Sequence, residues 1–229
     1  MTETENHTAG TTSEAAGLGR IYLLLARLYK DVAPAQLLSS LRDPRMTGVL
    51  EDLGCTFEKD FTGPSIDEDF VERMAVDFTQ LFIGPKEFIP PYESIFHQRD
   101  DDDWGKLWGA DTVKVKKFIE SAGLEFAPDY GGIPDHIAVE LEFMAAVTRK
   151  IEEATASGNW KDVLYFLKMK KLFFDEHLSQ WVPAFSDKVM AKAETSLYRE
   201  ITRVLRLFLQ LEHESLDEEI KEAEEKIAA

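Results

Sequence analysis

Residues 70–82 read FVERMAVDFTQLF, and the pattern of this stretch decides the fold class. Its apolar side chains recur at intervals of three or four residues, which places them on one face of an α-helix. Ser65 and Glu68 have the spacing of a capping box in front of the helix. Gly84-Pro85 must end it, because proline disfavours helical geometry in the residue before it. We therefore predict a core-facing helix between these two signals.

The same helical period occurs through most of the chain. Apolar stripes mark residues 18–29 and 197–209, and further helices are expected at 34–41, 45–53, 111–122 and 135–156, and from Asn159 to a break near Pro183. We predict an all-α protein, a single globular helical bundle of about eight to ten helices within residues 14–211. Residues 1–13 are expected to be a disordered tail, and residues 212–229 an acidic C-terminal tail that can form a fraying helix.

The composition excludes several classes of partner. A net charge of −17 and a pI near 4.7 argue against nucleic acid, because phosphate binding needs a basic surface. A cationic partner is favoured, although an acidic surface that only aids solubility is the simpler alternative. The single cysteine, Cys55, allows no internal disulfide and fits a reducing compartment. No apolar run reaches the roughly 20 residues that cross a bilayer, so a soluble protein without membrane insertion is expected.

The segment that follows the predicted helix at residues 70–82 is rich in proline and aromatic residues. Prolines restrict the backbone, so Tyr92 and Phe96 can be held in place before a ligand arrives, which lowers the ordering cost of binding. The structural alternative is a rigid loop whose aromatic side chains fill the core. The candidate ligand-binding residues of this region are Phe78, Gly84, Pro85, Pro90, Pro91, Tyr92, Glu93 and Phe96.

A second candidate site begins at Ile133-Pro134-Asp135-His136. Asp135 can cap the helix that follows, and His136 and Glu140 are four residues apart on one helical face, where an imidazole and a carboxylate can meet. The pair could share a structural hydrogen bond, form half of a metal site, or present donor and acceptor groups to a polar ligand.

The third constellation is the stretch 177–185, HLSQWVPAF, in which core packing of Trp181 and Phe185 is the simpler interpretation. A helical-bundle metalloprotein or enzyme that uses His136, Glu140 and His177 is an alternative function. Against it, the chain lacks the paired Glu-x-x-His motif of di-iron bundles, the His-Glu-x-x-His motif and a Gly-x-Ser-x-Gly elbow. A nucleotide-dependent switch is a further alternative, for which the sequence offers no phosphate loop. We expect neither a catalytic residue nor a bound metal or cofactor.

Taken in order, these constellations resemble the TorD/DmsD/NarJ family of redox-enzyme maturation chaperones. The resemblance covers roughly residues 70–189, and its motifs stand in the family's order and spacing. They are Leu81 to Pro85, Pro90 to Ser94, Asp135-His136, and His177 to Trp181. The stretch Pro134-Asp135-His136 followed by 140–143, ELEF, is similar to the nitrate-reductase and related dehydrogenase chaperones, since Gly132-Ile133 replaces the Glu-Pro of DmsD-like members.

The resemblance implies a cytoplasmic chaperone that binds the twin-arginine leader, or the N-terminal region, of a molybdenum oxidoreductase subunit and assists cofactor loading before export or assembly. It assigns leader binding to Asp135 and His136. Phe78, Tyr92 and Lys86 stand where DmsD-like members carry tryptophan. The implied partner is the apo form of the catalytic subunit, and the chaperone domain is expected to be a monomer or a helix-exchanged homodimer.

A twin-arginine leader carries two cations beside an apolar stretch, so its receptor needs carboxylates beside an apolar groove. We predict that Asp135, with Glu93 or Glu140, meets the arginines. Phe78, Tyr92 and Phe96 are expected to line the apolar groove. His136 is expected to orient Asp135 or to bind the client backbone. All of this requires the proline-rich segment and the start of the Asp-His helix to lie together in space.

Overall fold

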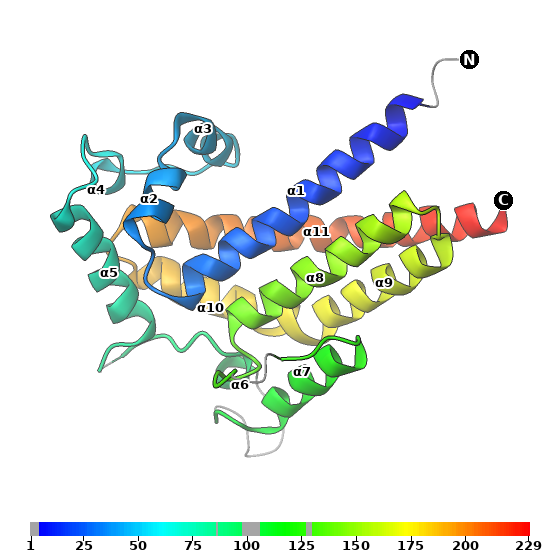
Figure 1. The fold of residues 1–229 in the computed structure, drawn as a ribbon. Helices are drawn as coiled ribbons and strands as arrows, with labels where there is room; N and C mark the ends of the chain where they lie inside the picture. The colour runs from blue at the N-terminus through cyan, green and yellow to red at the C-terminus, as the bar shows by residue number, and fades with distance from the viewer. Residues whose placement is uncertain (1–4, 86, 98–105, 127–129) are drawn as a thin grey trace.

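The computed structural model describes residues 5–85, 87–97, 106–126 and 130–229, and the regular elements within these ranges are all helices (Figure 1). The predicted all-α class is confirmed. In chain order the elements are α1 (Glu5–Lys30), α2 (Ala35–Leu41), α3 (Pro44–Asp52), α4 (Lys59–Thr62), α5 (Glu68–Phe82), α6 (Glu93–Phe96), α7 (Ala110–Ser121), α8 (Ile137–Ala156), α9 (Trp160–Phe173), the π-helical turn η1 (Phe174–Leu178), α10 (Ser179–Lys192) and α11 (Ser196–Ala228). None of these helices is long and apolar enough to cross a membrane.

The long helices form the body of the protein. Helix α8 packs against α1 and α9, and α11 packs against α9 and α10. The shorter helices α2 to α5 gather at one end of this bundle, whereas α6 and α7 lie beside the start of α8 (Figure 1). Helix α6 contacts α7 and α10, so the segment that carries it is held from two sides.

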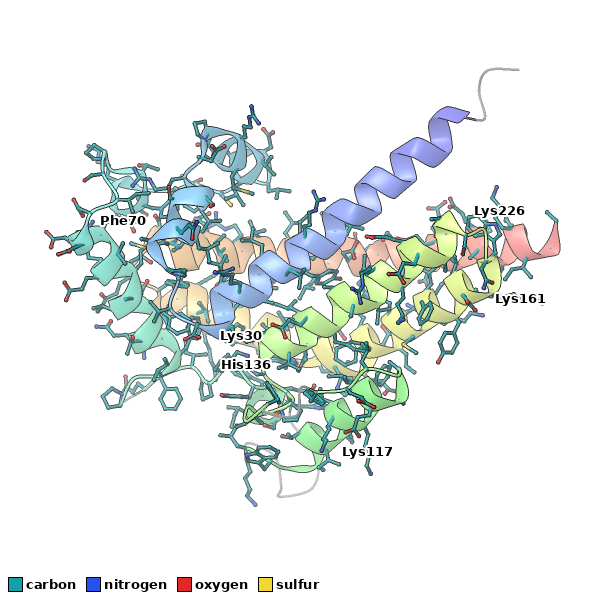
Figure 2. The ribbon with its side chains drawn as sticks, viewed as in Figure 1. Lys30, Phe70, Lys117, His136, Lys161 and Lys226 are labelled. Carbon is teal, nitrogen blue, oxygen red and sulfur yellow. The ribbon has the colours of Figure 1, made fainter. Side chains whose placement is uncertain are left out.

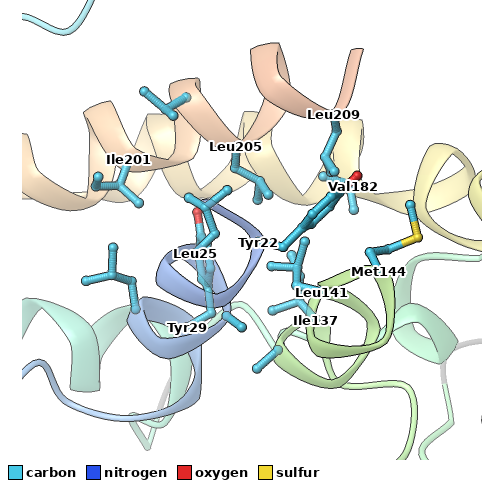
Figure 3. Packing of buried hydrophobic residues seen from close by; sticks show 14 of the residues in the cluster. Tyr22, Leu25, Tyr29, Ile137, Leu141, Met144, Val182, Ile201, Leu205 and Leu209 are labelled. Carbon is cyan, nitrogen blue, oxygen red and sulfur yellow. The ribbon is translucent and has the colours of Figure 1, made fainter. Parts of the chain in front are cut away.

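Apolar stripes on α1, α8 and α11 meet in the centre of the bundle (Figure 3). Each side chain of this core exposes no more than 4% of its surface, and its burial contributes about 1.5–3 kcal/mol relative to an exposed position. The stripes therefore account for the association of helices that are far apart in sequence. They consist of Tyr22, Leu25 and Tyr29 in α1, of Ile137, Leu141 and Met144 in α8, and of Ile201, Leu205 and Leu209 in α11.

The helix boundaries follow local capping chemistry, with one correction. Helix α5 is capped by Asp67, whose carboxylate accepts from the Phe70 N–H at 2.8 Å, so the predicted Ser65/Glu68 capping box is wrong. Ser65 instead donates to Asp67 at 2.7 Å and supports the cap indirectly. Asp67 has the advantage because its ionised carboxylate also interacts favourably with the positive end of the helix dipole.

The break expected at Pro183 is also wrong, because α10 continues through this residue. Proline cannot donate to the carbonyl four residues earlier, which belongs to Ser179. Ser179 follows directly after the π-helical turn η1, so the irregularity of the helix lies one turn before the proline. Residues Trp160 to Lys192 therefore form one continuous helix that is α-helical except for the π-helical turn at residues 174–178.

Both chain ends are helical in the structure, as was expected to be possible for residues 212–229. Helix α1 includes residues 5–13, where a disordered tail was expected. Once a helix has formed, each further residue adds one backbone hydrogen bond, so a helix can extend beyond the part that packs against the bundle. Residues 1–4 lie outside the described ranges. Helix α11 continues through the expected boundary at 211/212, and Leu216 and Ala223 are buried, so one face of the acidic segment packs against the bundle while most of its side chains are exposed.

A buried polar triad joins three helices of the bundle. The Lys170 ammonium group of α9 lies 2.5 Å from the Glu212 carboxylate of α11, and the Tyr22 hydroxyl of α1 donates to the same carboxylate at 3.1 Å. Lys170 exposes 2% and Glu212 6% of its side chain. Burial, followed by the charge of Glu212, raises the pKa of the Tyr22 hydroxyl well above its ordinary value. The triad fixes the relative register of α1, α9 and α11.

The Lys170→Met variant should lose about 3–5 kcal/mol in free energy of unfolding, because it leaves the Glu212 carboxylate buried without its cation. The Lys170→Met/Glu212→Leu double variant should recover much of this loss, since an apolar pair avoids the buried charge. Urea unfolding followed by circular dichroism measures both. A double variant that is as unstable as the sum of the two single variants would contradict this account.

Candidate functional site

The proline-rich segment and the start of the Asp-His helix lie directly beside each other. Tyr92 and His136 form an isolated antiparallel bridge. The Glu93 N–H donates to the Asp135 carbonyl at 3.0 Å, and the Ile137 N–H donates to the Pro91 carbonyl at 2.9 Å. Two segments more than forty residues apart in sequence therefore share a short stretch of backbone pairing. The proline-rich segment and the start of the Asp-His helix are thus adjacent, as the predicted site requires.

The paired backbone of residues 91–93 and 135–137 is called the junction below. Asp135 stabilises the junction with its side chain as well as its backbone. One carboxylate oxygen, Oδ2, accepts from the Ser94 N–H at 2.9 Å, in the first turn of α6. Asp135 exposes 0% of its surface, and its other oxygen has no hydrogen-bond partner within the described ranges. The side chain holds the proline-rich segment against α8 from beneath the surface.

His136, and not Asp135 as expected, caps helix α8. Its Nδ1 accepts from the Ala138 N–H at 3.0 Å, which requires the neutral ring with its proton on Nε2. Burial, and then the nearby charge of Lys30, lowers the pKa of His136 to about 4. Figure 2 shows His136 at the foot of α8, close to Lys30 at the end of α1. The Tyr92 ring packs edge-on against the imidazole, with ring centroids 5.0 Å apart.

Glu93 and Glu140 lie under this junction, and each has a ring-nitrogen partner. The Glu93 carboxylate accepts from Nδ1 of His177 at 2.9 Å, and Nδ1 of His97 lies 3.3 Å from its other oxygen. The Glu140 carboxylate accepts from the Trp181 indole N–H at 3.1 Å. Burial, and then the charge of Glu93, raises the pKa of Glu140 well above its ordinary value. Three buried carboxylates thus share one small region of the bundle.

Burial changes the expected roles of these acidic side chains. Asp135, Glu93 and Glu140 each expose 0% of their surface, so none is open to a guanidinium group in this conformation. The expectation that these three carboxylates meet a ligand's arginines directly therefore does not fit the described conformation. Their observed contacts are with the Ser94 backbone, with imidazole and with indole, all of which are internal donors.

The remaining candidate residues divide into buried and accessible groups. Phe78 exposes 2% and packs on Phe82 and Tyr198, so it belongs to the core in this structure. Gly84 is buried in a tight turn, where a Cβ atom would lie 3.1 Å from the Thr79 carbonyl oxygen. Pro91 is also buried, and Lys86 lies outside the described residues. The candidate residues that are at least partly exposed to solvent are Pro85, Pro90, Tyr92, Phe96 and His136.

An open groove beside the junction was not predicted. It has a volume of about 590 Å³ and reaches Pro134, next to Asp135. Two exposed carboxylates, Glu120 and Glu125, stand among its aromatic side chains, and Lys116 also lines the groove with its ammonium group 3.8 Å from Glu120. The aromatic residues that line it are Trp108, Phe126 and Tyr130. These residues come from the end of α7 and from the irregular segments around it, where no periodic pattern marks them in the sequence.

The alternative metal set of His136, Glu140 and His177 is not assembled. Among the described residues, the group with ligand atoms close enough to hold one ion is Glu93, His97 and Asp111. His136 faces the backbone of α8 through Nδ1 instead. Asp111 was not anticipated as a member of the region, because it lies in the first turn of α7, far from the quoted motifs.

The family model described as nitrate reductase delta subunit matches residues 47–187, which include both paired segments and His177. The chain belongs to this family. The resemblance to redox-enzyme maturation proteins of the TorD/NarJ type is therefore confirmed.

Relatives of this chain include the chaperone protein TorD of Vibrio cholerae. The two are 25% identical over 156 residues, which cover 68% of this chain and 67% of the relative. The chaperone protein TorD of Escherichia coli K12 is 22% identical over 219 residues, 90% of this chain and 99% of the relative. A solved structure of a putative redox enzyme maturation protein from Archaeoglobus fulgidus matches with a TM-score of 0.50 and 22% identity, covering 83% of this chain and 93% of that one. This likeness supports the fold.

Replacing His136 by asparagine keeps a side-chain cap for α8 and removes the titrating ring. The folded-state pKa of about 4 lies below the ordinary value of 6.5, so the folded protein binds fewer protons and loses stability as the pH falls from about 6.5 toward about 4. Between about pH 7.5 and about pH 5, the free energy of unfolding should fall by about 2 kcal/mol more in the wild type than in His136→Asn. Equal losses in urea unfolding at the two pH values would show that His136 is not held neutral.

Proposed function

We propose that this chain is a chaperone that binds the twin-arginine leader, or the N-terminal region, of a molybdenum oxidoreductase subunit and retains it while the cofactor is loaded. The chaperone names of the TorD relatives support the general role and a non-enzymatic activity. The single observation that carries the proposed location is the pairing of Tyr92 with His136, which brings both predicted segments to one place. Action before export would place the protein in the cytoplasm.

The groove beside Pro134 has the chemistry that a leader's arginines require. Glu120 and Glu125 are exposed, so they can pair with guanidinium groups without the cost of exposing the core. An arginine at Glu120 would replace its contact with Lys116, which at 3.8 Å between exposed side chains is weak. The aromatic rings of Phe126 and Tyr130, whose centroids lie 5.2 Å apart, offer faces on which an arginine can stack. We therefore assign the direct arginine contacts to this groove.

The buried carboxylates have an indirect role in this proposal. Asp135 holds Tyr92 and His136 at the surface, and its charge, with that of Glu93, adds to the negative potential of the region. Tyr92, Phe96 and Pro90 are partly exposed and supply apolar surface for the segment that follows the arginines. The net charge of −17 further favours the approach of a cationic peptide.

Calorimetric titration with a synthetic twin-arginine leader tests this assignment. The Glu120→Gln/Glu125→Gln variant should bind at least about tenfold more weakly than the wild type, because each lost charge-assisted hydrogen bond contributes about 1.5–3 kcal/mol when it is shielded from water. A leader with lysines in place of both arginines should also bind more weakly, since lysine cannot form the bidentate pair.

The matched control is Glu222→Gln/Glu225→Gln, which removes the same charge from exposed positions in the last turns of α11. It should bind the leader almost as well as the wild type, with a small loss that disappears at high salt. If the control and the groove variant lose affinity equally, the groove does not receive the arginines. If the wild type does not bind the leader, the proposed function is wrong.

A further inference from the structure

Beyond leader binding, we propose that Glu93, His97 and Asp111 form a binding site for a divalent transition-metal ion. The three residues join the single turn α6 to the first turn of α7. Each offers one ligand atom, and these atoms all lie within 4.8 Å of one another. The region is separate from the groove at Pro134, whose lining includes none of the three residues.

The spacing of the ligand atoms fits a small metal ion. Nδ1 of His97 lies 3.3 Å from Oε1 of Glu93 and 3.5 Å from Oδ1 of Asp111. Ligands bound at about 2.0–2.2 Å in a tetrahedral arrangement stand about 3.3–3.6 Å apart, which matches these two separations, and the oxygens of Glu93 and Asp111 lie within 4.8 Å of each other. Both separations are long for strong charge-assisted hydrogen bonds, which favour about 2.7–2.9 Å.

The buried His177 also holds the Glu93 carboxylate in position. Its Nδ1 lies 2.9 Å from Oε2 and 3.1 Å from Oε1 of Glu93. The imidazole is packed between aromatic rings, with the Phe173 centroid at 4.7 Å and the Phe118 centroid at 5.7 Å. A ligating carboxylate that is itself fixed by a buried hydrogen-bond partner is the usual arrangement around a bound metal ion. We assign His177 as a positioning residue and not as a ligand.

The carboxylates of the site are buried, and the ammonium group of Lys114 lies 3.4 Å from Oδ1 of Asp111. Glu93, Asp111, Asp135 and Glu140 expose no more than 2% of their surface. Burial, and then the charge of Glu93, raises the pKa of Glu140 well above its ordinary value, which favours the neutral carboxyl group, and this group can donate a hydrogen bond to Glu93. A divalent cation would offset the charges of the two ligating carboxylates, Glu93 and Asp111, which are costly to bury.

The donor set indicates the class of metal and the route to the site. One imidazole and two carboxylates suit zinc, manganese or ferrous iron and are less suited to calcium, which takes oxygen ligands. His97 exposes 23% of its side chain, so the site can be reached from solvent on this side. Because the ligands come from α6 and α7, a bound ion would fasten α7 to the segment that pairs with Asp135 and His136.

The test uses the full chain without an affinity tag, treated with a chelator, dialysed, and then titrated with zinc chloride and with manganese chloride in a calorimeter. We expect one equivalent of at least one of these ions to bind and to raise the melting temperature, because a ligand that binds only the folded state stabilises it. The His97→Asn variant should bind at least about tenfold more weakly, and its metal-free form should melt near the wild-type temperature, since His97 is partly exposed.

The matched control is His213→Asn, which changes a partly exposed histidine that pairs with Asp175 on another face of the bundle. It should bind the ion as the wild type does. The Asp111→Asn variant provides a second ligand change and should also weaken binding. The proposal is overturned if the wild type binds neither ion at one equivalent, or if His97→Asn and Asp111→Asn bind as tightly as His213→Asn. Leader binding measured in the chelator-treated protein keeps this outcome distinct from the proposed function.

Discussion

The backbone pairing between residues 91–93 and residues 135–137 is the constraint on which the site depends. A segment with two consecutive prolines lacks two backbone donors and cannot form a helix of its own there. Its remaining polar groups still need partners once they are buried. Asp135 provides both a carbonyl and a carboxylate for them. Everything attached to this segment, including the single turn α6 and the Glu93 carboxylate, takes its position from that junction.

The junction also determines how charge is distributed in the region. The carboxylates closest to it are internal and are held by histidine, indole and backbone donors. Such groups are costly to bury, so their hydrogen bonds must be retained if the fold is to remain unique. Exposed carboxylates stand instead in the neighbouring groove at Glu120 and Glu125. The acidic side chains that hold the structure together are therefore different residues from those that we propose to meet the leader.

The family match covers residues 47–187, whereas α1 and the whole of α11 lie outside it. Yet these two helices supply much of the central core and two members of the triad formed by Tyr22, Lys170 and Glu212. The matched region contains both paired segments, and the flanking helices hold them in register.

The sequence by itself determined the helical class, most helix positions and the segments that form the candidate site. Periodicity and capping are local properties, so the stripe at 70–82 and the Asn159 cap could be recognised without a structure. Only the tertiary structure decided which acidic side chains are buried, that His136 and not Asp135 caps α8, and that Glu93 meets His97, Asp111 and His177. Exposure and contacts between distant residues depend on how the helices pack, and no local pattern along the chain records that packing.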